Sequence, residues 1–558
     1  MVSKLRKVLI IGMDGATFDI LGPLMDEGWL PNLAKLRANG VWGKLRTTIP
    51  PVSASAWVSF ATGKNPGKHG LFDFVFPRPD GYEVCVANVT YRSGRAFWEY
   101  ISDAGGQVGL VNVPITYPPA SRPVNGFVAS CFLAPNFDSP WTYPDGLKYE
   151  LRDAVGEFPL IMSEAQRSGD VLKFIQEMRD FDLGRVKHVL YLMKNKTWDL
   201  FAFVFSSTDT LQHELWHLLD PGHPRHDAQQ ASRYHEAIWG FYADIDHALG
   251  QLIDAAGEDA LILIMSDHGA GPFQYFFHVN NWLHSLGLLR WKRNPVSMAK
   301  YTLYRLGFTP VNVLKMVTFL RLSRLRKNVK RGRGVKMLKR VFLSFNDVDW
   351  SHTAAFAVGN FGQIYINLAG KRTQGIVRSG AEYEALRDRI IREALALRDP
   401  ETGEAVIQYA YRKEEIYYGE SLVHAPDIIL HTDRSKYVSF GHADFGSNRI
   451  LEPSFGQTGH HQMDGILMIC GEQIQRGKKI EGAQIIDLAP TLLYAMGLPV
   501  PSDMDGRVLS EAFASEYMSA NPVRYEEVGC TKRPESEDYS EEDEERVMQR
   551  LRDLGYVS

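Results

Sequence analysis

The sequence contains few cysteines: four in 558 residues, at positions 85, 131, 470 and 530. They are widely spaced and form no Cys-x-x-Cys pair, which argues against a disulfide framework and a cysteine zinc site and indicates a reducing compartment. Long apolar runs are also missing. None approaches the roughly 20 residues that a membrane-spanning helix needs, and the apolar stretch before Asp14 is too short for a typical signal peptide. We therefore expect a cytoplasmic protein.

Two common phosphate-binding motifs are absent as well. There is no P-loop and no Gly-x-Gly-x-x-Gly. The sequence therefore lacks the phosphate-binding loops of kinases and nucleotide-dependent dehydrogenases, which argues against both functions. The formal net charge is only -4, which excludes a general polyanion binder, and we predict no specific nucleic-acid partner. Hydrophobic residues make up 45% and charged residues 23%, as in an ordinary globular protein. The length suits several domains, or one large domain with insertions.

Several buried strands are predicted to end in polar residues that can bind a ligand. The run 8–13 ends at Asp14, and the run 262–265 ends in Ser266-Asp267-His268-Gly269. In an α/β protein, ligands bind at the carboxyl ends of such strands. Asp14 could instead cap a helix, and a buried strand that ends in a polar turn is common. Asp267 and His268 become strong candidates for a functional site only if other parts of the chain place similar residues close to them.

A third strand, 200–205, leads to Asp209 and His213, which are four residues apart. On a helix this spacing places both side chains on one face. They could bind one metal ion together, or they could form a local hydrogen bond on a surface helix. A glycine-rich polar stretch, 455–465, contains His460 and His461, and one of them could be a further ligand.

Ser53 begins a predicted helix, 53–61, and two prolines, at positions 50 and 51, shortly precede it. A hydroxyl at a helix N-terminus is commonly an N-cap. It can also be a nucleophile, because the helix N-terminus helps to hold an anionic substrate. The residues alone leave both interpretations open.

Taken together, these stretches offer enough hard or borderline ligands for two divalent cations with a hydroxyl between them. Two ions about 3.5–4 Å apart can clamp the attacking and leaving oxygens of a phosphoryl displacement. The sequence therefore predicts metal-dependent phosphoryl chemistry. The candidate residues are Asp14, Ser53, Asp209, His213, Asp267, His268 and His461, with His460 as the alternative to His461.

A basic segment lies between residues 290 and 340. It holds sixteen lysines and arginines and no acidic residue, with apolar residues interleaved at roughly helical spacing. It could be a solvated helical insertion. Alternatively, it could be an amphipathic surface for an anionic membrane, a polyanion or an anionic substrate, which would place the protein at the membrane periphery.

The order of these motifs resembles that of the alkaline phosphatase superfamily, most closely its type I phosphodiesterase/nucleotide pyrophosphatase branch. The similarity covers most of residues 5–515. It rests on Met13-Asp14-Gly15, Ser53 followed by Thr62-Gly63 and His69-Gly70, Asp209 with His213, Ser266-Asp267-His268-Gly269 and the late Gly-x-His. Other stretches, among them 399–403 and 463–467, resemble a group of prokaryotic cytosolic members described as predicted phosphohydrolases or phosphomutases.

The resemblance implies an α/β fold: an alkaline-phosphatase-like three-layer sandwich with a mostly parallel central sheet and capping insertions. It implies two divalent metal ions, usually Zn²⁺, with Mn²⁺ in the mutase branch. Ser53 would bridge them and form a covalent intermediate, which metal-bound water would then hydrolyse. His461 is preferred to His460 because its spacing to Asp464-Gly465 fits the motif better. The implied ligand sets are Asp209, His213 and His461 for one ion, and Asp14, Asp267 and His268 for the other.

Two departures from related families matter. The diesterase branch usually has an asparagine a few residues beyond the His-Gly, where it contacts a phosphate oxygen, and here that place is Phe74, after Asp73. Other residues must then bind the phosphate group of the substrate. The Cys-x-Pro-x-Arg motif of sulfatases is also missing, which makes sulfate ester cleavage the weaker expectation.

We predict a metal-dependent phosphoric ester hydrolase acting on a phosphate-ester small molecule or a nucleotide. One alternative is a phosphomutase or phosphotransferase with the same site, and another is a non-enzymatic module that binds anionic surfaces through the basic segment. The predicted organisation is a discontinuous catalytic core, 1–270 and 351–515, a basic helical cap, 271–350, and a charged helical tail, 516–558.

Overall fold

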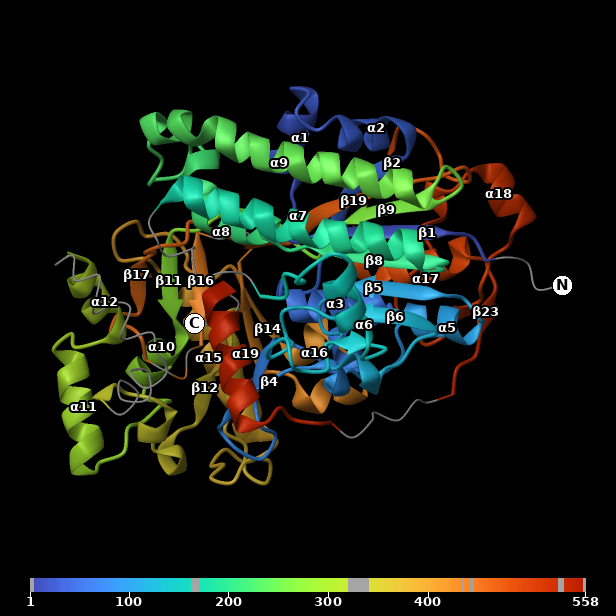
Figure 1. Cartoon of the computed structure of the whole chain (residues 1–558). Coiled ribbons are helices and arrows are strands. Elements are labelled where there is room, and N and C mark those ends of the chain that lie inside the picture. Colours follow the sequence, from blue (N-terminus) through green and yellow to red (C-terminus); the bar gives the residue numbers. More distant parts are fainter. Residues whose placement is uncertain are drawn as a thin grey trace.

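The structure is a computed structural model of the whole chain (Figure 1). It describes residues 5–161, 170–319, 341–432, 436–441, 443, 445–529 and 536–554. The part of the basic segment from 320 to 340, residue Cys530 and the last four residues of the predicted tail lie outside the described residues.

A ten-stranded sheet forms the centre of the molecule, in the order β20-β2-β19-β9-β1-β8-β5-β6-β7, with β21 beside β2. Five adjacent strands are parallel: β9 (Leu261–Met265), β1 (Val8–Met13), β8 (Leu200–Phe205), β5 (Val108–Val111) and β6 (Gly126–Ala129). Strand β19 (Asp464–Cys470) runs antiparallel to β9 and to β2 (Val41–Arg46). Short strands complete the edges: β20 (Lys478–Lys479), β21 (Ala483–Gln484) and β7 (Thr142–Tyr143).

The alternation of side chains along the buried strands creates two separate cores. In β1, Leu9 and Ile11 pack on one face with helices α7 (Val171–Asn195) and α9 (Ala228–Ala256). Val8 and Ile10 pack on the other face with α3 (Ser53–Thr62), α5 (Phe97–Asp103) and α17 (Leu488–Ala495). Because successive residues of a strand point to opposite faces, a strand that is apolar throughout requires helices on both sides. The predicted three-layer α/β sandwich is confirmed (Figure 1).

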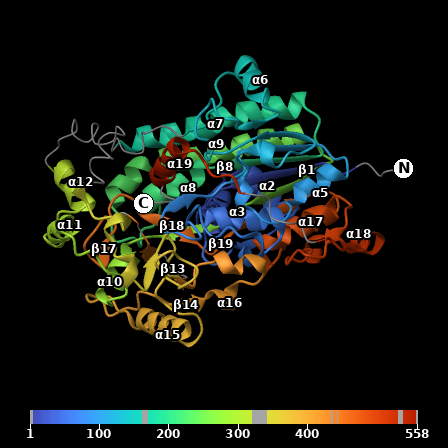
Figure 2. The same cartoon turned by 90° about the horizontal axis from the view of Figure 1, so that it is seen from below.

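A smaller lobe stands beside the carboxyl edge of the central sheet (Figure 2). It contains a four-stranded sheet in the order β12-β13-β15-β14 and a three-stranded sheet in the order β16-β11-β17. The two-stranded antiparallel sheet of β10 (Gly269–Pro272) and β18 (Gly459–Gln462) links the two lobes. The bounds are β12 (Ala355–Ala357), β13 (Gln363–Ile366), β15 (Ile428–His431), β14 (Tyr409–Arg412), β16 (Tyr437–Phe440), β11 (Tyr275–His278), β17 (Leu451–Pro453) and α15 (Ala381–Ala396).

The segment predicted as a helical cap, 271–350, contributes both strand and helix to this lobe. Strand β11 pairs with β16 and β17, and α10 (Val279–Ser285) follows it. Helices α11 (Pro295–Arg305) and α12 (Pro310–Phe319) then carry the described part of the basic segment. None of the described helices is both long and apolar enough to cross a membrane.

The C-terminal helix α19 (Glu541–Leu554) docks on the rest of the molecule. Val547 and Leu551 are fully buried in the larger core. The Arg550 guanidinium donates to three backbone carbonyl groups, those of residues 132, 134 and 135. The tail predicted from its charge pattern is therefore anchored by apolar burial as well as by polar contacts.

A buried polar network holds the start of helix α8 (Ser207–Leu219), the helix that carries Asp209 and His213. The carboxylate of Asp182, on α7, accepts from the backbone N–H groups of Ser206 and Ser207 at 3.4 and 2.9 Å. Arg185, one turn further along α7, donates to the Ser206 hydroxyl at 3.2 Å. Burial raises the pKa of Asp182 and lowers that of Arg185 to about 10. The pair thus fixes the N-terminus of α8 from within the core.

Replacing Asp182 with alanine should lower the free energy of unfolding by about 3–5 kcal/mol, because Arg185 would stay buried without its carboxylate. Urea denaturation measures this change. Asp180→Ala, at an exposed position on the same helix, is the matched control and should change stability by no more than about 0.5 kcal/mol. Equal effects of the two substitutions would contradict a structural role for the pair.

Candidate metal centre and active site

The predicted site residues meet at the carboxyl edge of the central sheet. Asp14 follows β1, and Asp267 with His268 follows β9. Gly15 has a φ of 66°, and a β-carbon there would lie 2.7 Å from Oδ1 of Asp209. Only glycine allows the chain after β1 to turn this close to α8.

One cluster consists of Asp14, Asp267 and His268, whose ligand atoms all lie within 4.8 Å of one another. Nε2 of His268 is 3.6 Å from Oδ1 of Asp14 and 3.4 Å from Oδ2 of Asp267. The Gly15 N–H donates to Oδ1 of Asp267, whereas the buried Oδ2 of Asp267 makes no hydrogen bond. Two carboxylates without water around them need a positive charge.

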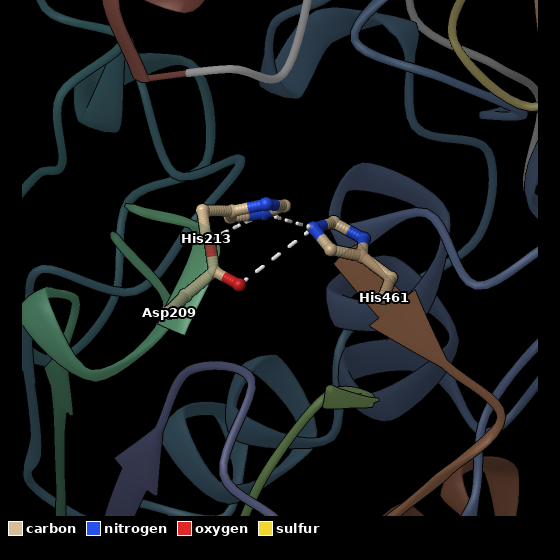
Figure 3. Close-up of side chains that lie close together, drawn as sticks. All are labelled: Asp209, His213 and His461. Atoms are coloured by element: carbon tan, nitrogen blue, oxygen red, sulfur yellow. Dashed lines mark hydrogen bonds and ion pairs between the residues drawn. The ribbon is translucent and has the colours of Figure 1, made fainter. Parts of the chain in front are cut away.

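The second cluster consists of Asp209, His213 and His461 (Figure 3). Asp209 and His213 lie one turn apart on α8, and His461 reaches them from β18. Nε2 of His213 is 3.3 Å from Oδ2 of Asp209, and Nε2 of His461 is 3.7 Å from Oδ1 of Asp209. The three side chains point toward one centre.

The hydrogen bonds of the three clustered histidines orient their rings in the same way. Nδ1 of His213, His268 and His461 lies 2.8 Å from the carbonyl oxygen of Gly459, Gly269 and Pro51, respectively. An Nδ1–H that donates to a carbonyl leaves Nε2 with its lone pair toward the site, as metal-binding histidines require. Two such lone pairs, on His213 and His461, face each other at 3.1 Å. This contact needs either a shared proton or a metal cation between the two nitrogens, and the donor set fits a divalent metal.

The pKa directions of the two histidines in this cluster differ. Burial, together with the neighbouring imidazoles of His268, His460 and His213, holds the pKa of His461 well below its usual value. Burial disfavours the protonated form of His213, but the Asp209 carboxylate favours that form more strongly and raises the pKa of His213. His461 therefore favours the neutral form in which an imidazole binds a metal ion. The raised pKa of His213 reflects the negative charge of Asp209, which would also attract a metal cation.

Ser53 contacts the cluster of Asp14, Asp267 and His268, which in turn touches the second cluster. Its Oγ lies 2.9 Å from Nε2 of His268, and the ring of His268 stacks on that of His461 with centroids 3.5 Å apart. The N-cap of α3 is Val52, so Ser53 is the first residue inside the helix. The N-cap interpretation of Ser53 is therefore wrong, and its hydroxyl faces the site.

His460 and His69 have other surroundings. Nδ1 of His460 accepts from the backbone N–H of His461, and His460 belongs to neither cluster. His69, which is fully buried, lies 2.9 Å from the Ser59 hydroxyl, and burial lowers its pKa to about 3. The structure brings His461, not His460, into the cluster.

A shallow hollow, open to solvent, lies beside His460 and His461. The prolines 50–51 form one wall, and segments of the smaller lobe form the others, including Asn360, Phe361 and Ser439. The ring of Phe361 lies 5.3 Å from that of His461. Sequence reasoning missed these residues, although Gly-Asn-Phe-Gly at 359–362, with both glycines at positive φ, is a sequence signal for a sharp functional turn.

Phe74 and Asp73 do not contribute ligands to the clusters. Phe74 is buried against Phe132, with ring centroids 5.8 Å apart. Asp73 is buried under the 359–362 turn and accepts from the Phe74 N–H at 2.6 Å. Burial raises its pKa to about 7, even though the backbone N–H groups of Phe74, Val75 and Asn360 act in the opposite direction.

The raised pKa of Asp73 should make stability depend on pH. Between about pH 4 and about pH 7 the folded chain holds a proton on Asp73 that the unfolded chain releases, so the free energy of unfolding falls as pH rises through this window. Asp73→Asn should abolish this decrease in the free energy of unfolding, which is on the order of 4 kcal/mol. Urea denaturation of both proteins across this range checks the difference, and parallel profiles would show that Asp73 ionises normally.

The chain was compared with known families and structures. Residues 8–446 match the family model described as type I phosphodiesterase / nucleotide pyrophosphatase. Phosphonoacetate hydrolase from Sinorhizobium meliloti 1021, in complex with phosphonoformate, is similar with a TM-score of 0.53 and 14% identity, over 88% of this chain and 95% of that chain. Human ectonucleotide pyrophosphatase / phosphodiesterase 5 gives a TM-score of 0.48 and 12% identity, over 92% and 99%.

The comparison with curated proteins gives no match. The likeness to phosphonoacetate hydrolase agrees with the α/β sandwich. The family match spans more than half of the chain and includes six of the seven predicted site residues, all except His461. This protein therefore belongs to the type I phosphodiesterase/nucleotide pyrophosphatase family of the alkaline phosphatase superfamily and is a phosphoester hydrolase.

Proposed function

We propose that this protein hydrolyses phosphoric esters through a covalent intermediate on Ser53, at a site that holds two divalent cations. One observation carries the proposal: the Ser53 hydroxyl lies beside two buried clusters of carboxylates and imidazoles that stack against each other. The family match supports the reaction class.

Each cluster would hold one ion. Asp209, His213 and His461 offer a carboxylate and two imidazoles to the first, and Asp14, Asp267 and His268 offer two carboxylates and one imidazole to the second. Such mixed oxygen and nitrogen sets without cysteine suit Zn²⁺ or Mn²⁺. When bound, the ions supply positive charge that neutralises the phosphate and lowers the pKa of the serine hydroxyl.

The residues around Ser53 orient it for attack. In the first step, its Oγ forms a bond to phosphorus while the bond from phosphorus to the leaving oxygen breaks, and the leaving alcohol takes up a proton. In the second step, the Oγ–phosphorus bond breaks as an oxygen from water takes its place, which restores the hydroxyl. The first N–H groups of α3 have no acceptor within the helix and favour the phosphate anion there.

The hollow would accept the rest of the substrate. Its described lining includes no lysine or arginine, so it favours an uncharged group over a second phosphate. Phe361 offers an aromatic face, and Asn360 and Ser439 offer hydrogen bonds. We infer that the substrate is a phosphate-ester small molecule or a nucleotide with one phosphate at the site.

We also infer that the protein works in the cytoplasm. Cys85, Cys131 and Cys470 are free thiols, and burial raises the pKa of all three. Cysteines that form no disulfide are typical of proteins in a reducing compartment.

Ser53→Ala should reduce the turnover of an artificial phosphodiester at least about a thousandfold, because the nucleophile is removed. Steady-state kinetics measure the loss, and mass spectrometry of rapidly quenched native protein should show a phosphoryl or phosphodiester adduct on Ser53. Ser55→Ala, a buried hydroxyl on the same helix, is the matched control and should keep most of the activity. Full activity of Ser53→Ala would refute the proposed nucleophile.

The same assay, run with an added acceptor alcohol, tests the alternative of a phosphomutase or phosphotransferase. Hydrolysis yields free phosphate or a shorter phosphate ester whether or not the alcohol is present. A new phosphate ester of the alcohol as the main product would instead show that the group on Ser53 passes to an alcohol.

Replacing His461 with alanine should reduce the bound metal from about two ions per chain to about one, because one ligand set would lose an imidazole. Elemental analysis of the purified protein measures the metal content without reference to activity. His460→Ala is the control and should keep both ions. If His460→Ala loses the ion and His461→Ala keeps it, the ligand assignment is reversed.

A further inference from the structure

Helix α11 presents an apolar stripe to solvent. Val296, Ala299, Leu303 and Leu306 recur at intervals of three or four residues and therefore share one face. Val296 is 66% exposed and Leu306, directly after the helix, is 79% exposed. Three further large apolar side chains of the segment 298–316 are also exposed. We call the six large side chains the outer apolar patch: Val296, Met298, Leu303, Leu306, Phe308 and Met316.

Polar contacts attach an adjoining face of this helix to the protein. The Ser297 hydroxyl and the Lys300 ammonium both donate to Asp347, at 2.8 and 3.0 Å. The Tyr304 hydroxyl donates to Asn281 at 2.7 Å. Surface helices normally bury their apolar face, but here Leu303 and Leu306 are exposed whereas Ser297 is buried. Figures 1 and 2 place α11 and α12 at the periphery of the smaller lobe.

The surroundings of the outer apolar patch are basic. Residues 290–319 contain six lysines and arginines and no acidic residue. Two of them are compensated, Lys300 by Asp347 and Lys315 by Glu452. The other four form no ion pair with a described carboxylate. They make up the basic rim: Arg290, Lys292, Arg293 and Arg305.

We propose that the outer apolar patch and its basic rim bind the surface of a membrane that contains anionic lipid. Exposed apolar side chains next to uncompensated positive charge are the features that place an amphipathic helix in the headgroup region of such a membrane. A second copy of this chain fits less well, because two basic rims would face each other. A nucleic acid would compensate the charge but leave the apolar side chains in water.

The proposal goes beyond the catalytic function and does not depend on it. The patch belongs to the smaller lobe, which also forms walls of the hollow. Membrane binding would hold the hydrolase at a lipid surface without changing its chemistry.

Sedimentation of the full chain with lipid vesicles tests the proposal. The native protein should bind vesicles of phosphatidylcholine with phosphatidylglycerol, bind more weakly at high salt, and bind vesicles of phosphatidylcholine alone poorly. The triple variant Val296→Ser, Leu303→Ser, Leu306→Ser should lower the partition coefficient at least about tenfold, because each substitution removes apolar surface that would enter the bilayer.

The matched control is the triple variant Leu172→Ser, Val423→Ser, Tyr525→Ser. It also removes three exposed apolar side chains, which are 49, 56 and 68% exposed, but on other elements. Both variants keep every basic residue. The control should bind vesicles like the native protein, and both variants should hydrolyse a soluble substrate at the native rate, which separates this test from that of the catalytic function.

Three outcomes would overturn the proposal. The native protein could fail to bind anionic vesicles, or the α11 variant could bind them as well as the control does. Light scattering could reveal a dimer that only the α11 variant loses, which would assign the patch to a second copy. Single-stranded RNA that displaces the vesicles and binds the α11 variant undiminished would show a polyanion surface instead.

Discussion

Three buried carboxylates at one edge of the sheet impose the main electrostatic constraint on this structure. Asp14, Asp209 and Asp267 are each about 1% exposed, and such groups are costly to bury as anions without a compensating positive charge. The nearby histidines cannot supply all of it, because burial and mutual repulsion keep His461 neutral. Two divalent cations would satisfy the whole set at once, which is why the geometry favours a two-metal hydrolase.

The rest of the fold serves to hold these groups in place. Parallel strands deliver Asp14, Asp267 and His268 to one edge, and backbone carbonyl groups set the rings of the three histidines. The Asp182–Arg185 pair on α7 fixes the start of α8 through Ser206 and Ser207. Positions far from the chemistry thus control the ligand geometry, as outer contacts do at many metal sites.

The smaller lobe adds functions that the sandwich lacks. Its turn at 359–362 provides a wall of the hollow, and its outer helix α11 carries an apolar face that no described part of the chain covers. One lobe would therefore combine the proposed substrate contacts with the proposed membrane surface. The phenylalanine at the position of the family's asparagine packs into the core, so our proposal assigns the contacts to substrate to this lobe.

The sequence by itself determined the class of fold and most of the candidate site. Strands that are apolar throughout require helices on both faces, and polar residues directly after β1 and β9 must lie at one edge, so these predictions depend only on local pattern. Asp209 and His213 share a face because of their helical spacing. The resemblance to a family added His461, which lies far away in the chain and has an equally suitable neighbour in His460.

Only the tertiary structure decided the remaining points. The approach of Gly15 to Asp209 and the role of Asp182 depend on contacts between distant segments, which no local pattern encodes. Ser53 is the first residue inside its helix rather than the cap, a difference of one residue that helix propensities do not resolve. The exposed face of α11 looks like a core-facing stripe in the sequence. It stays outside because polar contacts to Asp347 and Asn281 hold an adjoining face against the protein.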